Sequence, residues 1–387
     1  MSQPPASTTT PPAGSPWSAY RGIPLLHTLA GAMVELSETT GLDSFALPYP
    51  PETQRALDRT VLACLIRGAR PPRSVPELIA WCRTRPVADW PLDLPPDAVS
   101  AQDTLLDEDS GLPTELCREW ALRTADSAAR LEDREIIHTA MRLCREADDP
   151  VAYTNFRRLL VDQPVLTSAE AFHVACDHSL APVQELIGQI YQPAPAGYRR
   201  RGEFATCARC LTLLVPIDAY DWWCERDYCR RLGRPGIDRR LDADETGTLL
   251  QLGRPLRQFV TWPGRAEAEL ERELHRLGLQ VEMWPGFDAY DLRLTFPDGG
   301  PVWAVDVKDW AHPALLGQHA TPVRRAPGDD EAFWVVPGHR LLDQPDYLQI
   351  FTRNRPPHAK ELMLLTDRQL LVRAGRQLVS NQAVRDA

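Results

Sequence analysis

The stretch 290–308 reads YDLRLTFPDGGPVWAVDVK. Two runs in which apolar and polar residues alternate flank the four-residue turn PDGG, and this pattern predicts a β-hairpin. If Phe296 faces Pro301 across the turn, then Asp291 lies directly opposite Asp306. Cross-strand partners share one face of a sheet, with Cβ atoms about 5 Å apart. The sequence therefore predicts two carboxylates facing each other on neighbouring strands.

The face that carries these two aspartates has the chemistry of a metal site. Two opposed carboxylates repel each other unless a positive charge lies between them, and Lys308 joins their face because side chains alternate along a strand. Asp291, Asp306 and the backbone carbonyl of Val307 offer oxygen ligands, which suit Mg²⁺ or Mn²⁺. We expect such an ion to activate water for phosphodiester hydrolysis, with Lys308 near the attacking water.

Lysine is rare in this chain, which draws attention to Lys308. The 43 basic residues include two lysines, Lys308 and Lys360, and all the others are arginine. Arginine is a planar fork that stays charged, whereas lysine is a compact, rotatable ammonium. A lysine beside two strand aspartates therefore indicates a position that chemistry requires. The plain alternative is that Asp306 and Lys308 form the polar side of an edge strand.

A helix predicted for 265–277 precedes the hairpin and supplies a fourth candidate. Its apolar face is formed by leucines, and Glu267 lies on the same stripe because it precedes Leu270 by three positions and Leu274 by seven. Glu267 is therefore predicted to assist the site, and Glu273 at the other edge of the face is the runner-up.

Four of the nine cysteines form a cluster in the sequence. Cys207 and Cys210 make a CxxC pair, and Cys224 and Cys229 follow. Four thiolates satisfy the tetrahedral preference of a structural Zn²⁺ and leave no open position for catalysis. We expect a zinc-ribbon-like module here. The alternatives are reduced thiols without a metal or a redox CxxC pair.

The overall charge of −10 does not indicate a nucleic-acid binder. The segment 198–240, however, contains ten arginines and six acidic residues. A local basic face can hold a phosphate backbone while the rest of a molecule is acidic; the alternative is a solvated surface. No apolar run approaches the roughly 18 residues of a membrane span, and the N-terminal segment lacks a signal-peptide pattern. We expect a cytoplasmic protein with no membrane contact.

The rest of the pattern predicts a multi-domain chain with an all-α N-terminal domain. The helix at 51–68 is predicted to bury an apolar face (Leu57, Val61, Leu62, Leu65 and Ile66), and capping boxes are predicted at Ser74–Glu77 and Thr167–Glu170. After the hairpin, strands are predicted at 331–336, 361–365 and 369–372, with a short helix at 347–352. The expected parts are a disordered tail (1–16), the helical domain (17–195), the zinc-binding module (196–240) and an α/β nuclease domain (241–387).

Residues 262–372 resemble the PD-(D/E)xK restriction-endonuclease-like superfamily. More narrowly, WPGFDAYDL (284–292) with AVDVKDW (304–310) resembles the nuclease encoded in bacterial three-gene islands with a PIWI-like protein (pPIWI-RE) and a DinG-type helicase. The resemblance implies a four-stranded mixed sheet flanked by helices, Mg²⁺-dependent DNA cleavage and a role in defence against phage or plasmids. Asp291, Asp306 and Lys308 match the family's motif positions.

A second class of function stays open from the sequence alone. In that reading the chain is a non-catalytic nucleic-acid-binding or adaptor protein, which binds through the zinc module and its arginines. RNA as the nucleic acid and a homo-oligomeric state also stay open.

Overall fold

The computed structural model describes residues 17–38, 49–122, 128–217 and 220–385. The predicted tail at 1–16 lies outside these residues. The chain forms two compact units, and the first combines residues up to Ser127 with the later segment Ala311–Gln318. The second unit contains Ala128–Trp310 and His319 onward. Within the described residues, no helix has both the length and the apolarity that a membrane crossing needs.

The first unit is helical, as predicted. Its core surrounds Trp120, which is fully buried, stacks on Trp17 at 5.7 Å and accepts a hydrogen bond from His27 Nδ1 at its carbonyl oxygen. The carboxylate of Glu119 accepts hydrogen bonds from the backbone N–H of Ala311 and of the next residue. The elements of this unit are η1 (Trp17–Ala19), α1 (Gly22–Glu38), α2 (Pro51–Ile66), α3 (Val75–Thr84), η3 (Val87–Asp89), α4 (Glu115–Ala121) and α13 (Pro313–Gln318).

The predicted buried face of α2 is wrong. The helix buries Thr53, Ala56, Thr60 and Cys64, while three of its large apolar residues, Leu62, Leu65 and Ile66, are 57%, 62% and 60% exposed. Small residues allow α1 and α2 to approach closely. The hydroxyl of the buried Thr60 is hydrogen-bonded within the helix, because it donates to the Ala56 carbonyl at 2.7 Å. Close packing decided the face here, and hydrophobicity did not.

The second unit begins with helices that precede the cysteine cluster. The predicted capping box that opens α7 is confirmed, because Thr167 Oγ1 accepts from the N–H of Glu170 and the Glu170 carboxylate accepts from the N–H of Thr167. A small antiparallel sheet of order β1-β7-β2 closes this part. Its elements are α5 (Ala128–Glu146), α6 (Pro150–Asp162), β1 (Val165–Leu166), α7 (Ser168–Ala175), η4 (His178–Val183), α8 (Gln184–Ile190), β2 (Tyr191–Pro193), η5 (Ala196–Tyr198) and β7 (Leu250–Leu252).

The four-cysteine module (residues 196–240) is built from short elements. Strand β3 (Glu203–Cys207) pairs with β6 (Ile237–Asp242), β4 (Val215–Pro216) pairs with β5 (Trp222–Trp223), and α9 (Asp227–Arg231) follows. Such small pieces have little core of their own, and the apolar cluster here consists of the four cysteines with Ala205, Leu214, Trp222 and Trp262.

The C-terminal part is a five-stranded mixed sheet of order β12-β11-β10-β9-β8. Strands β8, β9 and β10 are antiparallel, and β10, β11 and β12 are parallel. The predicted fold class is confirmed, with one strand more than the resemblance implied. The strands are β8 (Gln280–Met283), β9 (Leu292–Thr295), β10 (Val302–Val307), β11 (Glu331–Val336) and β12 (Leu364–Thr366).

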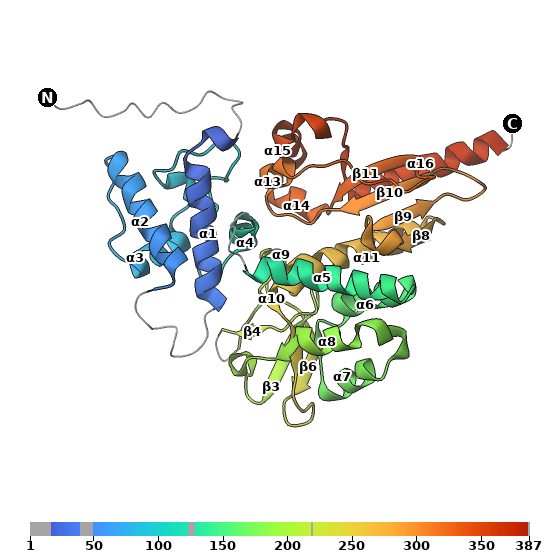
Figure 1. Cartoon of the computed structure of the whole chain (residues 1–387), viewed down its shortest axis with the longest axis horizontal. Helices are drawn as coiled ribbons and strands as arrows, with labels where there is room; N and C mark the ends of the chain where they lie inside the picture. The colour runs from blue at the N-terminus through green and yellow to red at the C-terminus, as the bar shows by residue number, and fades with distance from the viewer. Residues whose placement is uncertain (1–16, 39–48, 123–127, 218–219, 386–387) are drawn as a thin grey trace. The chain divides into compact units, whose positions relative to one another are not determined.

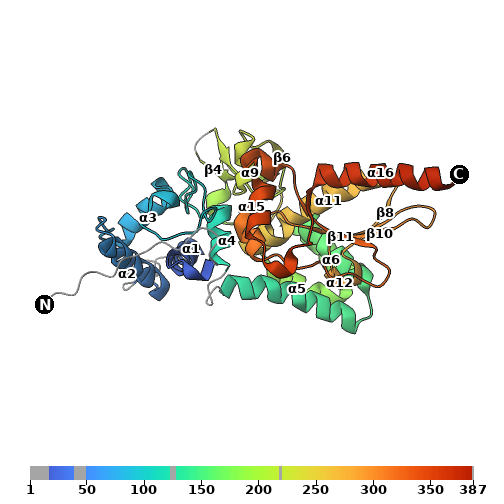
Figure 2. The same ribbon diagram turned by 90° about the horizontal axis from the view of Figure 1, so that it is seen from above.

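Helices flank this sheet: α11 packs against β8, and α16 packs against β11 and β12 (Figures 1 and 2). The strand predicted at 369–372 is wrong, because these residues belong to α16. The helical elements are α10 (Arg254–Leu256), the π-helix η6 (Arg257–Thr261), α11 (Trp262–Arg276), α12 (Pro285–Asp288), α14 (His339–Asp343), α15 (Tyr347–Asn354), η7 (Pro357–Ala359) and α16 (Asp367–Arg385).

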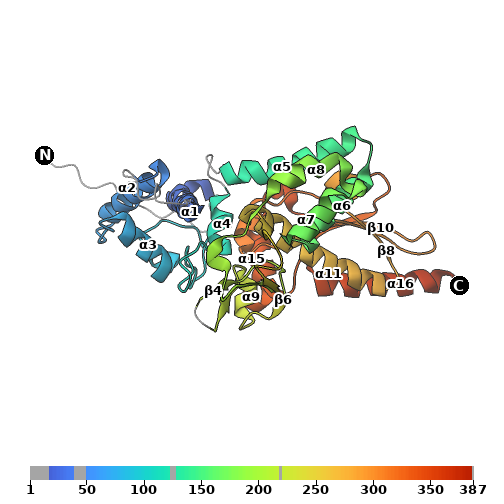
Figure 3. The same ribbon diagram turned by 90° about the horizontal axis from the view of Figure 1, so that it is seen from below.

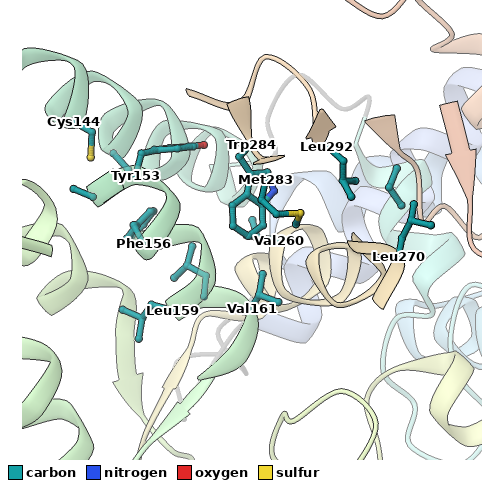
Figure 4. Packing of buried hydrophobic residues seen from close by; sticks show 14 of the residues in the cluster. Cys144, Tyr153, Phe156, Leu159, Val161, Val260, Leu270, Met283, Trp284 and Leu292 are labelled. Atoms are coloured by element: carbon teal, nitrogen blue, oxygen red, sulfur yellow. The ribbon is translucent and has the colours of Figure 1, made fainter. Parts of the chain in front are cut away.

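One continuous core joins the helices before the module to the sheet. Helix α6 packs against α11 so closely that a Cβ on Gly264 would lie 2.3 Å from Val161 Cγ2. Figure 4 shows Tyr153 and Phe156 of α6 in the same cluster as Trp284 and Leu292. Figure 3 gives the view from below, in which α6 lies near α11. Residues on both sides of the cysteine module thus share one interior.

Candidate active site

The hairpin has the predicted register. The N–H of Phe296 donates to the carbonyl of Pro301 at 3.2 Å, and the ladder pairs Thr295 with Val302 and continues to the pair of Leu292 with Val305. The paired residues end there, one position before Asp306 on β10 and just after Asp291, which precedes β9.

Lys308 lies against Asp306. Its Nζ is 2.6 Å from Asp306 Oδ1 and 5.2 Å from the centre of the Trp334 ring. Burial disfavours the charged ammonium, but the carboxylates of Asp306 and Asp291 outweigh it and raise the pKa of Lys308. Lys308 is therefore a fixed cation, and it stabilises negative charge on the face that the aspartates share.

Asp291 is a carboxylate that is buried close to other carboxylates. It is 9% exposed, and its Oδ2 accepts a hydrogen bond from the N–H of Val307 at 2.5 Å. Burial, followed by the charges of Glu267 and Asp306, raises the pKa of Asp291 well above its ordinary value. A carboxyl with such neighbours is stabilised as an anion only by added positive charge.

Glu267 reaches this group from α11, as the helical face predicted. It is 3% exposed, and its Oε2 accepts a hydrogen bond from Trp284 Nε1 at 2.7 Å. Burial raises the pKa of Glu267 to about 7, although Arg157 opposes the shift. The runner-up Glu273 forms an exposed ion pair with Arg276 instead.

A buried arginine that no sequence pattern predicts also belongs to this site. Arg157 of α6 donates from NH1 to Asp288 Oδ2 at 2.8 Å, and its NH2 lies 3.7 Å from Glu267 Oε2. Its guanidinium also lies over the Trp284 ring at 5.0 Å, and the Tyr153 hydroxyl donates to Asp288 at 2.9 Å. Arg157 lies more than a hundred positions before its partners, and no local pattern marks it.

The turn before Asp291 is strained. Trp284, Gly286, Phe287 and Asp288 all have φ between 50° and 67°, a region that costs non-glycine residues on the order of 1 kcal/mol each. The turn places the Trp284 indole on Glu267 and the Asp288 carboxylate on Arg157. Backbone strain of this kind clusters at functional sites.

The carboxylates are neighbours, but they do not converge on one point. Among the residues that the structure describes, only the four cysteines form a group of three or more metal-ligating side chains within 4.8 Å of one another. Asp291 and Asp306 each use one oxygen, on the Val307 N–H and the Lys308 ammonium respectively. Each therefore keeps its second oxygen for a further ligand.

The cysteine cluster is assembled as predicted. Cys207, Cys210, Cys224 and Cys229 are buried, and their sulfurs all lie within 4.8 Å. Hydrogen bonds from the three other thiols lower the pKa of Cys207, and the pKa values of Cys224 and Cys229 are raised. Four thiols this close cannot all ionise without a cation among them, so the donor set fits a thiophilic metal ion.

The arginines around the cluster are largely engaged within the protein. Arg200 lies over Trp222 at 4.0 Å and Arg230 over Trp223 at 4.7 Å. Others form ion pairs with carboxylates: Arg199 with Asp244, Arg234 with Asp221, Arg239 with Glu170 and Arg240 with Glu203. These contacts weaken the reading of the segment as a free basic face.

One buried ion cluster links the module to the hairpin. The carboxylate of Asp309, directly after Lys308, lies 2.6 Å from Arg226 NH2 and 2.6 Å from Arg340 Nε, with His339 Nε2 at 3.2 Å. Although burial opposes it, Arg340 and Arg226 hold the pKa of Asp309 far below its ordinary value. Asp309 is therefore a permanently charged anchor.

Comparison with known families agrees with this geometry. Residues 264–382 match the family model described as "REase associating with pPIWI_RE". The C-terminal domain belongs to this family. Residues 25–167 of the same chain match "pPIWI_RE three-gene island domain Y". No curated protein and no solved structure matches the chain.

The REase match covers Glu267, both hairpin aspartates and Lys308. Arg157, in contrast, lies in the domain Y match, and the cysteine cluster lies in neither matched segment. Side chains from both matched segments, Arg157 and Glu267, therefore meet at the candidate site.

Proposed function

We propose that the REase domain is a metal-dependent endonuclease that hydrolyses phosphodiester bonds of DNA. The observation that carries the proposal is that Asp291 and Lys308 both make contacts at the end of β10: the Val307 N–H donates to Asp291 Oδ2 at 2.5 Å, and Lys308 Nζ lies 2.6 Å from Asp306 Oδ1. Two carboxylates, one ammonium and a buried glutamate are the groups that such hydrolysis requires.

The donor set fits Mg²⁺ or Mn²⁺. The second carboxylate oxygens of Asp291 and Asp306, with the carbonyl of Val307, would hold the ion, and all are the hard oxygen donors that these ions prefer. When bound, the ion supplies a water of lowered pKa and neutralises charge on the phosphate.

The side chains have separate roles in this proposal. Lys308 stabilises the hydroxide or the charge that develops on the scissile phosphate, because it is a fixed cation on the reacting face. Glu267 assists by holding a proton or a water at its carboxylate, and its pKa of about 7 suits a group that exchanges protons near neutral pH. Arg157 keeps Glu267 oriented and partly charged.

We propose further that the four-cysteine cluster binds a structural Zn²⁺, which the four buried thiols fit. Both family matches name pPIWI_RE, and the domain Y match names a three-gene island. Together with the resemblance in sequence, they support a role beside a PIWI-like protein and a DinG-type helicase in defence against phage or plasmids. DNA is the proposed substrate, and RNA is tested as the alternative substrate.

The test is Asp306→Ala in the purified full chain. With Mg²⁺ or Mn²⁺ we expect cleavage of plasmid or single-stranded DNA to fall by about 100-fold or more, the scale of losing one essential electrostatic group. Asp346→Ala removes an exposed aspartate of the same domain and should leave the rate unchanged. Cleavage by Asp306→Ala at the wild-type rate contradicts the proposed active site. Parallel assays with RNA show which nucleic acid is the substrate, and assays with added partner proteins show whether a partner controls cleavage.

The adaptor alternative receives less support. It needs an α/β domain that only packs and a module whose arginines are available to a nucleic acid. The two aspartates share a face with Lys308, and many of the module's arginines are held by carboxylates or tryptophans.

A further inference from the structure

Three consecutive residues of the four-cysteine module touch different parts of the molecule. Cys224 belongs to the cysteine cluster, with its sulfur 3.4 Å from that of Cys210. Glu225 and Arg226 follow directly, and both are nearly fully buried, at 3% and 4% exposure. Charged residues are almost never buried unless they are paired, so the partners of these two side chains show what the module holds.

Glu225 holds the element that leads into α11. Its two carboxylate oxygens accept from Arg257 Nε at 2.5 Å and NH2 at 2.8 Å, a bidentate pair that is buried on both sides. Arg257 opens the π-helix η6, which continues directly into α11 and so into Glu267. A bidentate arginine–carboxylate pair fixes direction as well as distance. Glu225 therefore sets where α11 begins.

Arg226 holds the other half of the site. Its NH2 lies 2.6 Å from Asp309 Oδ2, and Asp309 is 1% exposed and adjacent to Lys308 in the chain. The same guanidinium lies over the ring of Trp262, the first residue of α11, at 5.8 Å. Arg226 thus contacts the end of β10 and the start of α11 together.

We propose that Cys224-Glu225-Arg226 is a clamp that holds α11 and β10 in the relative position at which the candidate active site works. The metal state of the cysteine cluster then sets that position, because Cys224 is both a cluster member and the start of the clamp. Glu225 and Arg226 are positioning residues, since neither touches the reacting groups. The effect on catalysis rests on the proposed nuclease function; the mechanical coupling does not.

The variants are chosen so that the protein still folds. Removing one partner of a buried ion pair leaves an unpaired charge, whereas neutralising both partners is far better tolerated. The test variant is therefore Arg226→Met with Asp309→Asn, in which the side-chain amide oxygen and the backbone carbonyl at position 309 can still accept hydrogen bonds from Arg340. Arg226→Lys is the conservative variant. Arg240→Met is the matched control, because Arg240 lies in the same module and its ion pair with Glu203 is exposed.

The first readout is independent of cleavage. Hydrogen–deuterium exchange of the full chain is followed in segments 257–270 and 302–310, with zinc content and thermal unfolding measured on the same samples. We expect the double variant to exchange faster in both segments while Zn²⁺ is retained, and wild-type protein stripped of Zn²⁺ to do the same. Unchanged exchange in a folded double variant, or the same change in Arg240→Met, overturns the clamp.

The second readout concerns the site itself. We expect the double variant to bind Mn²⁺ at the nuclease site about 10-fold to 100-fold more weakly, the usual effect of disturbing groups behind metal ligands. Its kcat for DNA should fall while KM stays near the wild-type value, and Arg226→Lys should recover part of the loss. If exchange changes as expected but wild-type protein neither binds Mn²⁺ nor cleaves, the clamp stands and the nuclease proposal fails. Wild-type Mn²⁺ affinity and kcat in the double variant contradict the active-site role of the clamp.

Discussion

Lys308 is the position at which arginine is least able to replace lysine. The chain uses arginine at almost every basic position, yet the ammonium of Lys308 occupies a narrow place between Asp306 and the Trp334 ring. A guanidinium is wider, planar and bidentate. It would draw Asp306 away from any third ligand.

We therefore expect Lys308→Arg to lower kcat by about 100-fold or more although the charge is conserved. Lys360→Arg is the matched control, since Lys360 is exposed and lies outside the site. Steady-state kinetics on DNA measure both variants. Equal activity of the two would show that position 308 needs only a positive charge.

Glu267 gives the site a pH dependence that is measurable without catalysis. Burial raises its pKa to about 7, whereas an unfolded glutamate titrates near about 4.3. A group whose pKa is raised by folding contributes stability that is full below the unfolded pKa and is lost as the pH rises through the folded pKa.

In buffer without free divalent cations, Glu267→Gln should therefore gain thermal stability relative to wild type as the pH rises from about 4.5 to about 7.5. The amide keeps an oxygen for the Trp284 indole, so the comparison isolates the charge. Unfolding midpoints across this range measure the difference, and a difference that does not vary with pH contradicts the buried titration.

At the scale of elements, α6 contributes to a site that lies in another part of the sequence. Arg157 is held between Asp288 and Glu267, and the close packing of α6 on α11 at Gly264 leaves it little freedom to move. Its charge lowers the pKa of Glu267.

Removal of that charge should shift the acid side of the activity profile. We expect Arg157→Met to move the acid limb of the pH–rate profile to higher pH, because Glu267 then loses its proton less readily. Arg142→Met is the control, since Arg142 lies on the preceding helix α5 and its ion pair with Glu146 is exposed. Wild-type acid limbs in both variants would exclude an electrostatic role for Arg157.

The elements also show where sequence patterns succeed. The hairpin register follows from a period of two and one turn, so counting from Phe296 and Pro301 gives the observed pairs from Thr295–Val302 to Leu292–Val305. The face of α11 is equally readable, because leucines mark it. The spacing of the four cysteines in the sequence predicts their cluster.

Other features depend on contacts that no local pattern encodes. The buried face of α2 carries Thr53 and Thr60 because α1 packs closely there. Residues 369–372 read QLLV, a short apolar run that suits a strand, yet they lie within α16. Arg157, Glu225 and Arg226 act through partners far away in the chain, so only the folded molecule reveals them.

At the scale of the whole molecule, the REase segment shares its hydrophobic core with helices that precede it in the chain. The buried cluster includes Tyr153 and Phe156 together with Trp303 and Phe333. A fragment of residues 241–387 would expose the apolar surface that α6 covers in the full chain, and it would lack Arg157 and the clamp.

We expect that fragment to show no cooperative unfolding and no cleavage, because burial of apolar surface supplies most of the stability of a domain. Circular dichroism during heating measures this, with the full chain as the reference. A fragment that melts cooperatively at the full-length midpoint would show that the sheet is an independent domain.

The segment Ala311–Gln318 has a consequence for inheritance. It lies in the chain between β10 and β11, yet it belongs to the compact unit built by the first part of the protein. A gene fusion that exchanged only the front of the protein would leave this segment without the surface for which it was selected. A recombination event would therefore have to replace two separate stretches of the gene at once, so the front and the back of this protein are expected to descend together.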